Sequence, residues 1–337
     1  MKRLSLILVL ALVALLATTW LVLRRGDIPY DRLEARYATQ ASQFMTLQDG
    51  LKIHYTDTGT PDRPVIVLVH GFSASLHTWN DWVEDLSQDY RVITLDLPGH
   101  GLSRAEPPEL ATIPRFVACV DALVQALGVE RFTLAGNSMG GNTAWQYALT
   151  YPERLEGLIL VAASGWSEGN ASDEDDPLMF RLLRHPVARI VLKDLDMTRL
   201  ARKILADSYV DQSFVTDATV ERYVDLSRAP GHRETLLAIL SGSREKLTAE
   251  RLAPLQIPVL ILWGAEDNLV PASHADKFAS ALPQADKIIY PDIGHLPQEE
   301  HAAVSIADVR AFMNRVEWHV LEDEIIQPTG DPRLGSR

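Results

Sequence analysis

Residues 131–143 read RFTLAGNSMGGNT, and the prediction of the fold starts from the centre of this stretch. Residues 136–140 have the pattern glycine–x–serine–x–glycine, with Ser138 in the middle. Such a pattern marks a reactive serine only where a strand runs into it and a helix leaves it. Residues 132–135 read as a buried strand and residues 139–149 as a helix. The stretch therefore predicts a sharp strand-to-helix turn that lifts a serine hydroxyl above a sheet.

The residues around this serine also predict a site for a negatively charged oxygen. Gly136 and Gly140 have no side chains, so the strand and the helix can approach each other closely. The backbone N–H of Met139 lies in the first helical turn, where amide donors are unpaired. A second donor is expected after the strand at 64–69, from the N–H of Phe72. One such donor is worth about 3 kcal/mol in a transition state.

A serine hydroxyl is a weak nucleophile until a base removes its proton. We expect His295 to be this base, because it directly follows the last predicted strand and sites lie at the carboxyl ends of such strands. Asp267 follows the strand at 259–263 and is expected to orient the histidine, with Glu266 as its competitor. The resulting order, Ser138, Asp267, His295, is the order typical of this architecture.

Strand and helix patterns alternate along most of the chain, which predicts an α/β fold with a mostly parallel central sheet and helices on both faces. A break in this alternation predicts a helical insertion between two strands. The strand patterns cover residues 44–47, 51–55, 64–69, 92–97, 132–135, 158–162, 259–263 and 287–290. The helical patterns cover residues 77–86, 113–127, 139–149, 272–281 and 299–315.

These patterns predict five regions. The core is expected at residues 44–165 and 252–318, with a helical cap at 166–251 inserted between its two parts. A polar linker is expected at residues 26–43 and a loose tail at 319–337.

The N-terminus differs from the rest because residues 4–23 carry no charge. At roughly 1.5 Å per residue this segment would extend about 30 Å, the thickness of a bilayer core. We predict a transmembrane helix within a membrane anchor at residues 1–25, which places the catalytic domain on the extracytoplasmic side. A cleaved signal peptide is the alternative, but its apolar part is usually shorter and ends in small residues.

Composition narrows the classes of function. Of the 337 residues, 47% are hydrophobic and 23% are charged, the balance of a globular protein. The net charge is −13 and no dense basic run follows residue 36, which argues against nucleic-acid binding. Cys119 lies in an apolar helical pattern and is expected to be a buried, unreactive thiol. The predicted chemistry requires no metal and no organic cofactor.

Taken together, the motifs make the chain resemble the α/β-hydrolase superfamily between residues 44 and 316. They are His70-Gly71-Phe72 with Trp79 after it, Asp96-Leu97-Pro98-Gly99-His100-Gly101-Leu102-Ser103, Gly136-Asn137-Ser138-Met139-Gly140-Gly141, Gly264-Ala265-Glu266-Asp267, and Gly294-His295. The resemblance implies a cap domain over the site. It also implies a catalytic triad and two oxyanion donors, which are Ser138, Asp267 and His295, and Phe72 and Met139.

The same motifs favour some reactions over others. Relatives that open epoxides or remove halides carry an aspartate where this chain has Ser138. The loop reads His-Gly-Phe, whereas hormone-sensitive-lipase-like esterases have His-Gly-Gly-Gly. The turn at 136–141 resembles that of carbon–carbon bond hydrolases acting on ring-cleavage products. The His-Gly-Phe-Ser-Ala stretch and the apolar N-terminus resemble monoacylglycerol-lipase-type and other bacterial lipases and esterases.

Three hypotheses of function follow. The first is a membrane-anchored serine hydrolase that cleaves carboxylic esters, including lipid-like ones, through an acyl-enzyme, with residues 4–23 in the bilayer. The second is a carbon–carbon bond hydrolase of a dienoic keto acid. Its anionic substrate requires a cap arginine facing the serine, and the cap has many arginines, among them Arg181, Arg184, Arg189 and Arg222. The third is a non-catalytic binding protein with a hydrolase fold.

Overall fold

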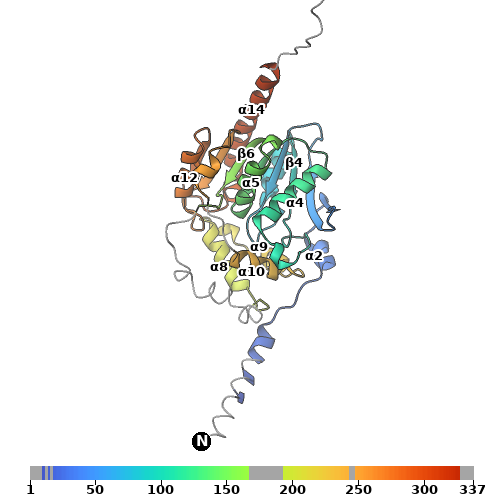
Figure 1. Ribbon diagram of the computed structural model, residues 1–337. Helices are drawn as coiled ribbons and strands as arrows, with labels where there is room; N and C mark the ends of the chain where they lie inside the picture. Colours follow the sequence, from blue (N-terminus) through green and yellow to red (C-terminus); the bar gives the residue numbers. More distant parts are fainter. Residues whose placement is uncertain (1–9, 12–13, 16–17, 167–192, 243–246, 327–337) are drawn as a thin grey trace, which may run out of the picture.

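One mixed sheet lies at the centre of the structure, with helices around it (Figure 1). Its strands lie in the order β1-β2-β4-β3-β5-β6-β7-β8. The pairs β1/β2 and β2/β4 are antiparallel and the other pairs are parallel, which confirms the predicted mostly parallel sheet. The strands are β1 (Ser42–Thr46), β2 (Lys52–Thr58), β3 (Val65–Val69), β4 (Arg91–Leu95), β5 (Phe132–Asn137), β6 (Leu155–Val161), β7 (Val259–Gly264) and β8 (Asp286–Tyr290).

The computed structural model describes residues 10–11, 14–15, 18–166, 193–242 and 247–326. Strand residues alternate between two apolar clusters, one on each face of the sheet. Val67 joins the cluster of Trp145, whereas Ile66 joins that of Trp82. Both faces are therefore buried, which explains the unbroken apolar run in β3.

Helices cover both faces, as the alternating pattern predicts. The first cluster includes residues of α4 (Ile113–Ala126), α5 (Met139–Thr150), α11 (Ala249–Leu252) and α12 (Ser273–Ala281). The second includes residues of α3 (Asn80–Leu86) and α14 (Ala302–Ile326). Short turns of helix are η1 (Leu76–Trp79), η2 (Pro108–Leu110), η3 (Pro152–Arg154) and α13 (Pro297–Glu300).

Between β6 and β7 the described residues form helices and no strand. They are α8 (Thr198–Ser208), η4 (Gln212–Phe214), α9 (Asp217–Ser227), α10 (His232–Ser241) and α11. Helices α8, α9 and α10 lie together at one end of the sheet (Figure 1). Residues 167–192 and 243–246 of the same region lie outside the described part. The division of the chain into a core and a cap remains a prediction.

The segment before β1 is attached to these helices. Helix α2 (Tyr30–Tyr37) lies within the region predicted as a linker, and its Leu33 side chain is buried. The Tyr37 hydroxyl donates to Asp225 Oδ2 at 3.0 Å. The amide of Arg25 donates to the carbonyl of Asp194 at 2.7 Å. These contacts join the N-terminal segment to the region predicted as the cap.

The predicted transmembrane helix at residues 4–23 receives no support from the structure. Residues 4–9, 12–13 and 16–17 lie outside the described part of the chain. Among the residues that are described, no helix combines the length and the apolar character needed to cross a bilayer.

Helix α14 continues to Ile326, so its last residues lie within the region predicted as a loose tail from residue 319. Residues 327–337 lie outside the described part, and the tail at 319–337 remains a prediction.

Candidate active site

The turn at Ser138 has the geometry that the sequence predicts. Strand β5 ends at Asn137, α5 begins at Met139, and Ser138 between them has φ 54° and ψ −114°. A non-glycine residue with positive φ costs about 1–3 kcal/mol, a strain typical of functional sites. A Cβ on Gly136 would lie 2.1 Å from the carbonyl oxygen of Gly140. The turn therefore depends on glycine at this position.

Replacing this glycine tests how tightly the turn is built. We expect Gly136→Ala to lower the free energy of unfolding by about 3 kcal/mol, because rigid backbone blocks the new methyl group. Gly26→Ala is the matched control, since a Cβ there would meet nothing within 4 Å. Urea denaturation of both variants measures the difference. Equal stabilities would contradict the close approach.

Asp267 and His295 are in direct contact. His295 Nδ1 lies 2.7 Å from Asp267 Oδ2, and both side chains are buried. The other carboxylate oxygen accepts from the amides of Leu269 and Val270 at 2.8 and 2.9 Å. The competitor Glu266 is exposed. The carboxylate is therefore held in place and fixes the imidazole with its other nitrogen, Nε2, free to face a substrate or a serine.

The histidine loop is joined to the turn by Asn137, the residue before Ser138. The Asn137 side-chain amide donates to the carbonyl of His295 at 3.2 Å and to that of Val161 at 3.3 Å. The amide of Ser138 donates to the same Val161 carbonyl at 3.0 Å. The sequence analysis missed Asn137, because no pattern distinguishes a variable position inside the motif. Its contact keeps residues 138 and 295 at the same edge of the sheet.

The loop after β3 lies against the turn, as an oxyanion site requires. A Cβ on Gly71 would approach the Ser138 Cβ to 3.2 Å. His70 Nδ1 lies 2.7 Å from the carbonyl of Gly71, and its Nε2 accepts from the amide of Leu97 at 3.0 Å. Burial lowers the pKa of His70. A buried, neutral His70 thus holds the backbone of this loop.

The two amides predicted as oxyanion donors are available. Among the described residues, the N–H groups of Phe72 and Met139 donate no hydrogen bond to a protein acceptor. Met139 begins helix α5, where the helix dipole favours negative charge. The roles of Phe72, Met139 and the three side chains remain predictions.

A second contact between serine, histidine and aspartate lies elsewhere in the fold. His54 Nδ1 is 2.6 Å from Asp96 Oδ2, and His54 Nε2 is 2.8 Å from Ser42 Oγ. Asp96 also accepts from the amides of Leu76 and Leu102, at 2.7 and 2.8 Å. Since the carboxylate ties two loops together and both it and the imidazole are fully buried, this cluster is structural.

Within the described residues, no three histidine, cysteine or acidic side chains are grouped to hold a metal ion.

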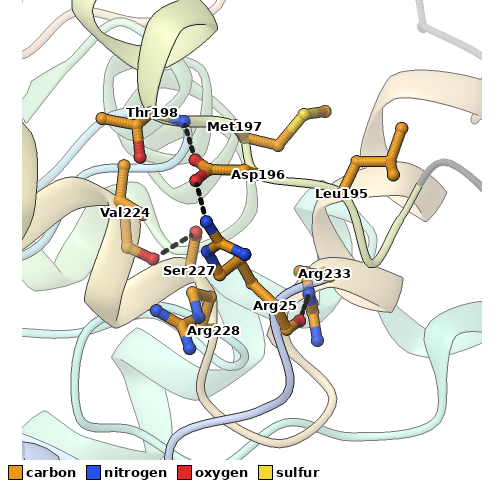
Figure 2. Close-up of a pocket in the computed structure, with 9 residues that line it drawn as sticks. All are labelled: Arg25, Leu195, Asp196, Met197, Thr198, Val224, Ser227, Arg228 and Arg233. Atoms are coloured by element: carbon orange, nitrogen blue, oxygen red, sulfur yellow. Dashed lines mark hydrogen bonds and ion pairs between the residues drawn. The ribbon is translucent and has the colours of Figure 1, made fainter. Parts of the chain in front are cut away.

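A pocket lies away from the candidate active site. It is shown in Figure 2, and none of the predicted site residues line it. Arg25 pairs there with Asp196 at 3.1 Å, and Arg233 donates to the carbonyl of Arg25 at 2.7 Å. These bonds attach the N-terminal segment to Asp196, two residues before α8, and to α10.

The comparisons with known proteins agree with this geometry. The family model described as alpha/beta hydrolase fold matches residues 64–302. A 2-hydroxy-6-oxo-6-phenylhexa-2,4-dienoate hydrolase from Burkholderia cepacia is 28% identical over 77% of this chain and 92% of that relative. A 2-hydroxy-6-oxononadienedioate/2-hydroxy-6-oxononatrienedioate hydrolase from Comamonas testosteroni is 29% identical over the same shares, 77% and 92%. The crystal structure of a membrane phospholipase A, a bacterial virulence factor, superposes on this chain with a TM-score of 0.69 at 25% identity and covers 94% of this chain and 99% of its own.

The fold and the turn at Ser138 define a class of α/β enzymes in which a nucleophile stands between a strand and a helix. The chain belongs to the α/β hydrolase fold family, which confirms the resemblance found in the sequence. Membership supports a hydrolase. The two curated relatives carry the names of carbon–carbon bond hydrolases, so they favour the second hypothesis over ester cleavage.

Proposed function

We propose that the protein is a serine hydrolase in which Ser138 attacks a carbonyl carbon. The observation that supports this most is the bond between His295 and Asp267 beside the turn at Ser138. His295 removes the hydroxyl proton, and Asp267 stabilises the imidazolium that forms. The amides of Phe72 and Met139 bind the oxyanion. Water, with His295 as base, then releases the acyl group from the serine.

We place cleavage of a carbon–carbon bond first, in a 2-hydroxy-6-oxo dienoate. In the keto form of such a substrate, Ser138 adds to the carbonyl at carbon 6. The bond between carbons 5 and 6 then breaks, and its electron pair is taken up by the conjugated ketone at carbon 2. The enolate oxygen at carbon 2 then receives the proton from His295, which leaves a 2-hydroxydienoate. The names of the two curated relatives support this assignment.

One arginine of the predicted cap, Arg222, is a candidate to bind the carboxylate of this anionic substrate. Arg222 lies on α9, and its Nε is buried without a hydrogen-bond partner among the described residues. Its neighbours Val220 and Tyr223 pack with Leu296, which follows His295. An unpaired buried donor costs about 1–3 kcal/mol, which a carboxylate would recover. The other candidates, Arg181, Arg184 and Arg189, lie outside the described residues.

Ester cleavage is the second candidate, because it uses the same nucleophile, base and oxyanion donors. The likeness to the membrane phospholipase A extends over nearly all of this chain and supports this alternative. It also supports anchoring of the protein to a bilayer by residues 4–23, with the hydrolase domain on the extracytoplasmic side. In the described part, Leu21 and Val22 are exposed apolar side chains next to Arg24 and Arg25.

Two chromogenic substrates separate these reactions. We expect kcat/KM for 2-hydroxy-6-oxo-6-phenylhexa-2,4-dienoate to exceed that for p-nitrophenyl butyrate by roughly tenfold or more, since only the dienoate has a carboxylate for Arg222. Loss of dienoate absorbance and release of nitrophenol measure the two rates. The Arg222→Gln variant should raise KM for the dienoate alone. Faster turnover of the ester, unaffected by Arg222→Gln, would replace the first assignment by the second.

A further inference from the structure

The loop that carries His295 is bonded to the chain at the end of α8. The amide of His295 donates to the carbonyl of Ser208 at 2.8 Å. This approach requires Gly294, because a Cβ there would lie 2.4 Å from the same Ser208 oxygen. The backbone next to the proposed base thus rests on the insertion between β6 and β7, not only on the sheet.

A side-chain hydrogen bond to Glu299, four residues after His295, adds to this main-chain contact. The Tyr209 hydroxyl donates to Glu299 Oε2 at 2.8 Å, and the Thr78 hydroxyl donates to the other oxygen of that carboxylate. Glu300 accepts from the amide of Gly294 at 2.7 Å and also from the amide of Asp211. Residues 208–211 and the histidine loop are therefore joined by both main-chain and side-chain hydrogen bonds.

The surroundings of Tyr209 hold its ring in one orientation. Tyr209 stacks on Phe214, with ring centroids 5.3 Å apart and planes 10° apart. It belongs to a buried cluster with Leu205, Val220 and Leu296, the residue after His295. Because packing already fixes the ring, the hydroxyl meets Glu299 at little further cost in side-chain entropy.

Glu299 makes the contact sensitive to the exact position of the insertion. The pKa of its carboxyl is raised by burial, while the hydrogen bonds from Thr78 and Tyr209 and the charge of Arg222 oppose that rise. A buried carboxylate is costly when a donor is withdrawn. A displacement of Tyr209 would withdraw a donor from a carboxylate on α13, and α13 begins two residues after His295.

We propose that Tyr209 and Glu299 are positioning residues that couple the insertion between β6 and β7 to the catalytic histidine. The proposal rests on the proposed function, in which His295 is the base. Neither residue touches the reacting atoms. Together they keep the His295 loop in the place where the imidazole serves Ser138, so a shift of α8 and η4 changes the reactivity of the serine.

The test measures the reactivity of Ser138 directly with a fluorophosphonate probe on the full chain. The serine oxygen forms a bond to phosphorus, fluoride leaves, and His295 takes the serine proton. We expect Tyr209→Phe to slow labelling about tenfold, because small misplacements of a catalytic group have large effects on rate. Tyr223→Phe is the matched control, since Tyr223 packs in the same cluster and its hydroxyl makes no hydrogen bond within the described part of the chain. It should label at the wild-type rate.

Steady-state kinetics distinguish positioning from packing. With the better of the two substrates above, Tyr209→Phe and Glu299→Gln should lower kcat and leave KM within about twofold, and the double variant should be no slower than the slower single one. A rise in KM at constant kcat, additive losses, or equal effects of Tyr209→Phe and Tyr223→Phe would overturn the proposal. Melting temperatures identify any variant whose loss follows unfolding; the other variant of the pair then decides. If Ser138 in the wild-type chain does not label, the proposed function fails instead.

Discussion

Ser138→Ala is expected to reduce kcat by a factor on the order of 10⁶, because removing the nucleophile of such a triad costs as much as removing the whole triad. The fold should persist. Ser138 already has positive φ as a non-glycine residue, and among the described residues its hydroxyl makes no hydrogen bond that stabilises the turn. Turnover and fluorophosphonate labelling measure the loss, and a circular dichroism spectrum matching that of the wild type shows that the variant is folded.

The structure supplies a demanding control for this experiment. Ser42 also contacts a histidine that is paired with an aspartate, at 2.8 Å from His54 Nε2. Ser42→Ala should keep labelling and turnover close to those of the wild type, because its partners His54 and Asp96 are fully buried and hold loops together. Labelling that is lost in Ser42→Ala and retained in Ser138→Ala would show that Ser42 is the nucleophile, which contradicts the proposed mechanism.

The sheet and the turn were predictable because their signals are local. The apolar run that became β3, the glycines around Ser138 and the alternation of strands and helices each follow from short-range sterics and burial. Asp267 could be preferred to Glu266 for a similar reason. It stands where the chain leaves β7, and its carboxylate turns back onto the amides of Leu269 and Val270.

Contacts between distant parts of the chain could not be predicted in this way. Asn137 bonds to residue 295, and Tyr209 bonds to Glu299, without any periodicity or motif that links the partners. Helix α2 lies in a polar stretch that reads as a linker, yet Leu33 is buried and Tyr37 bonds to Asp225. In each case tertiary packing decides the role of a side chain that looks unremarkable in the sequence.

The sequence could not decide between carbon–carbon bond cleavage and ester cleavage, for a different physical reason. Attack by a serine, proton transfer by a histidine and binding of an oxyanion are the same for an ester and for a ketone. What differs is the leaving group, and the groups that recognise it are expected in the insertion between β6 and β7. Part of that region, residues 167–192, lies outside the described residues, so Arg222 is the cap arginine on which the assignment can be tested.

Asp267→Asn should lower kcat by about 10⁴ while leaving the fold intact, the effect expected when a histidine takes the wrong tautomer. In the wild type, Asp267 Oδ2 accepts from Nδ1–H of His295, so Nε2 is the basic nitrogen. The asparagine Oδ1 can still accept from the amides of Leu269 and Val270, and its NH₂ group then faces Nδ1. The proton moves to Nε2, which can no longer accept the serine proton.

The neighbouring acid gives the matched control for this substitution. Glu266 is exposed, so Glu266→Gln changes the charge one residue away and leaves the bond between Asp267 and His295 in place. Rates of fluorophosphonate labelling and of substrate turnover should fall together in Asp267→Asn and stay near the wild-type values in Glu266→Gln. A loss of less than about tenfold in Asp267→Asn would mean that His295 does not depend on this carboxylate, and the base would then have to be sought elsewhere.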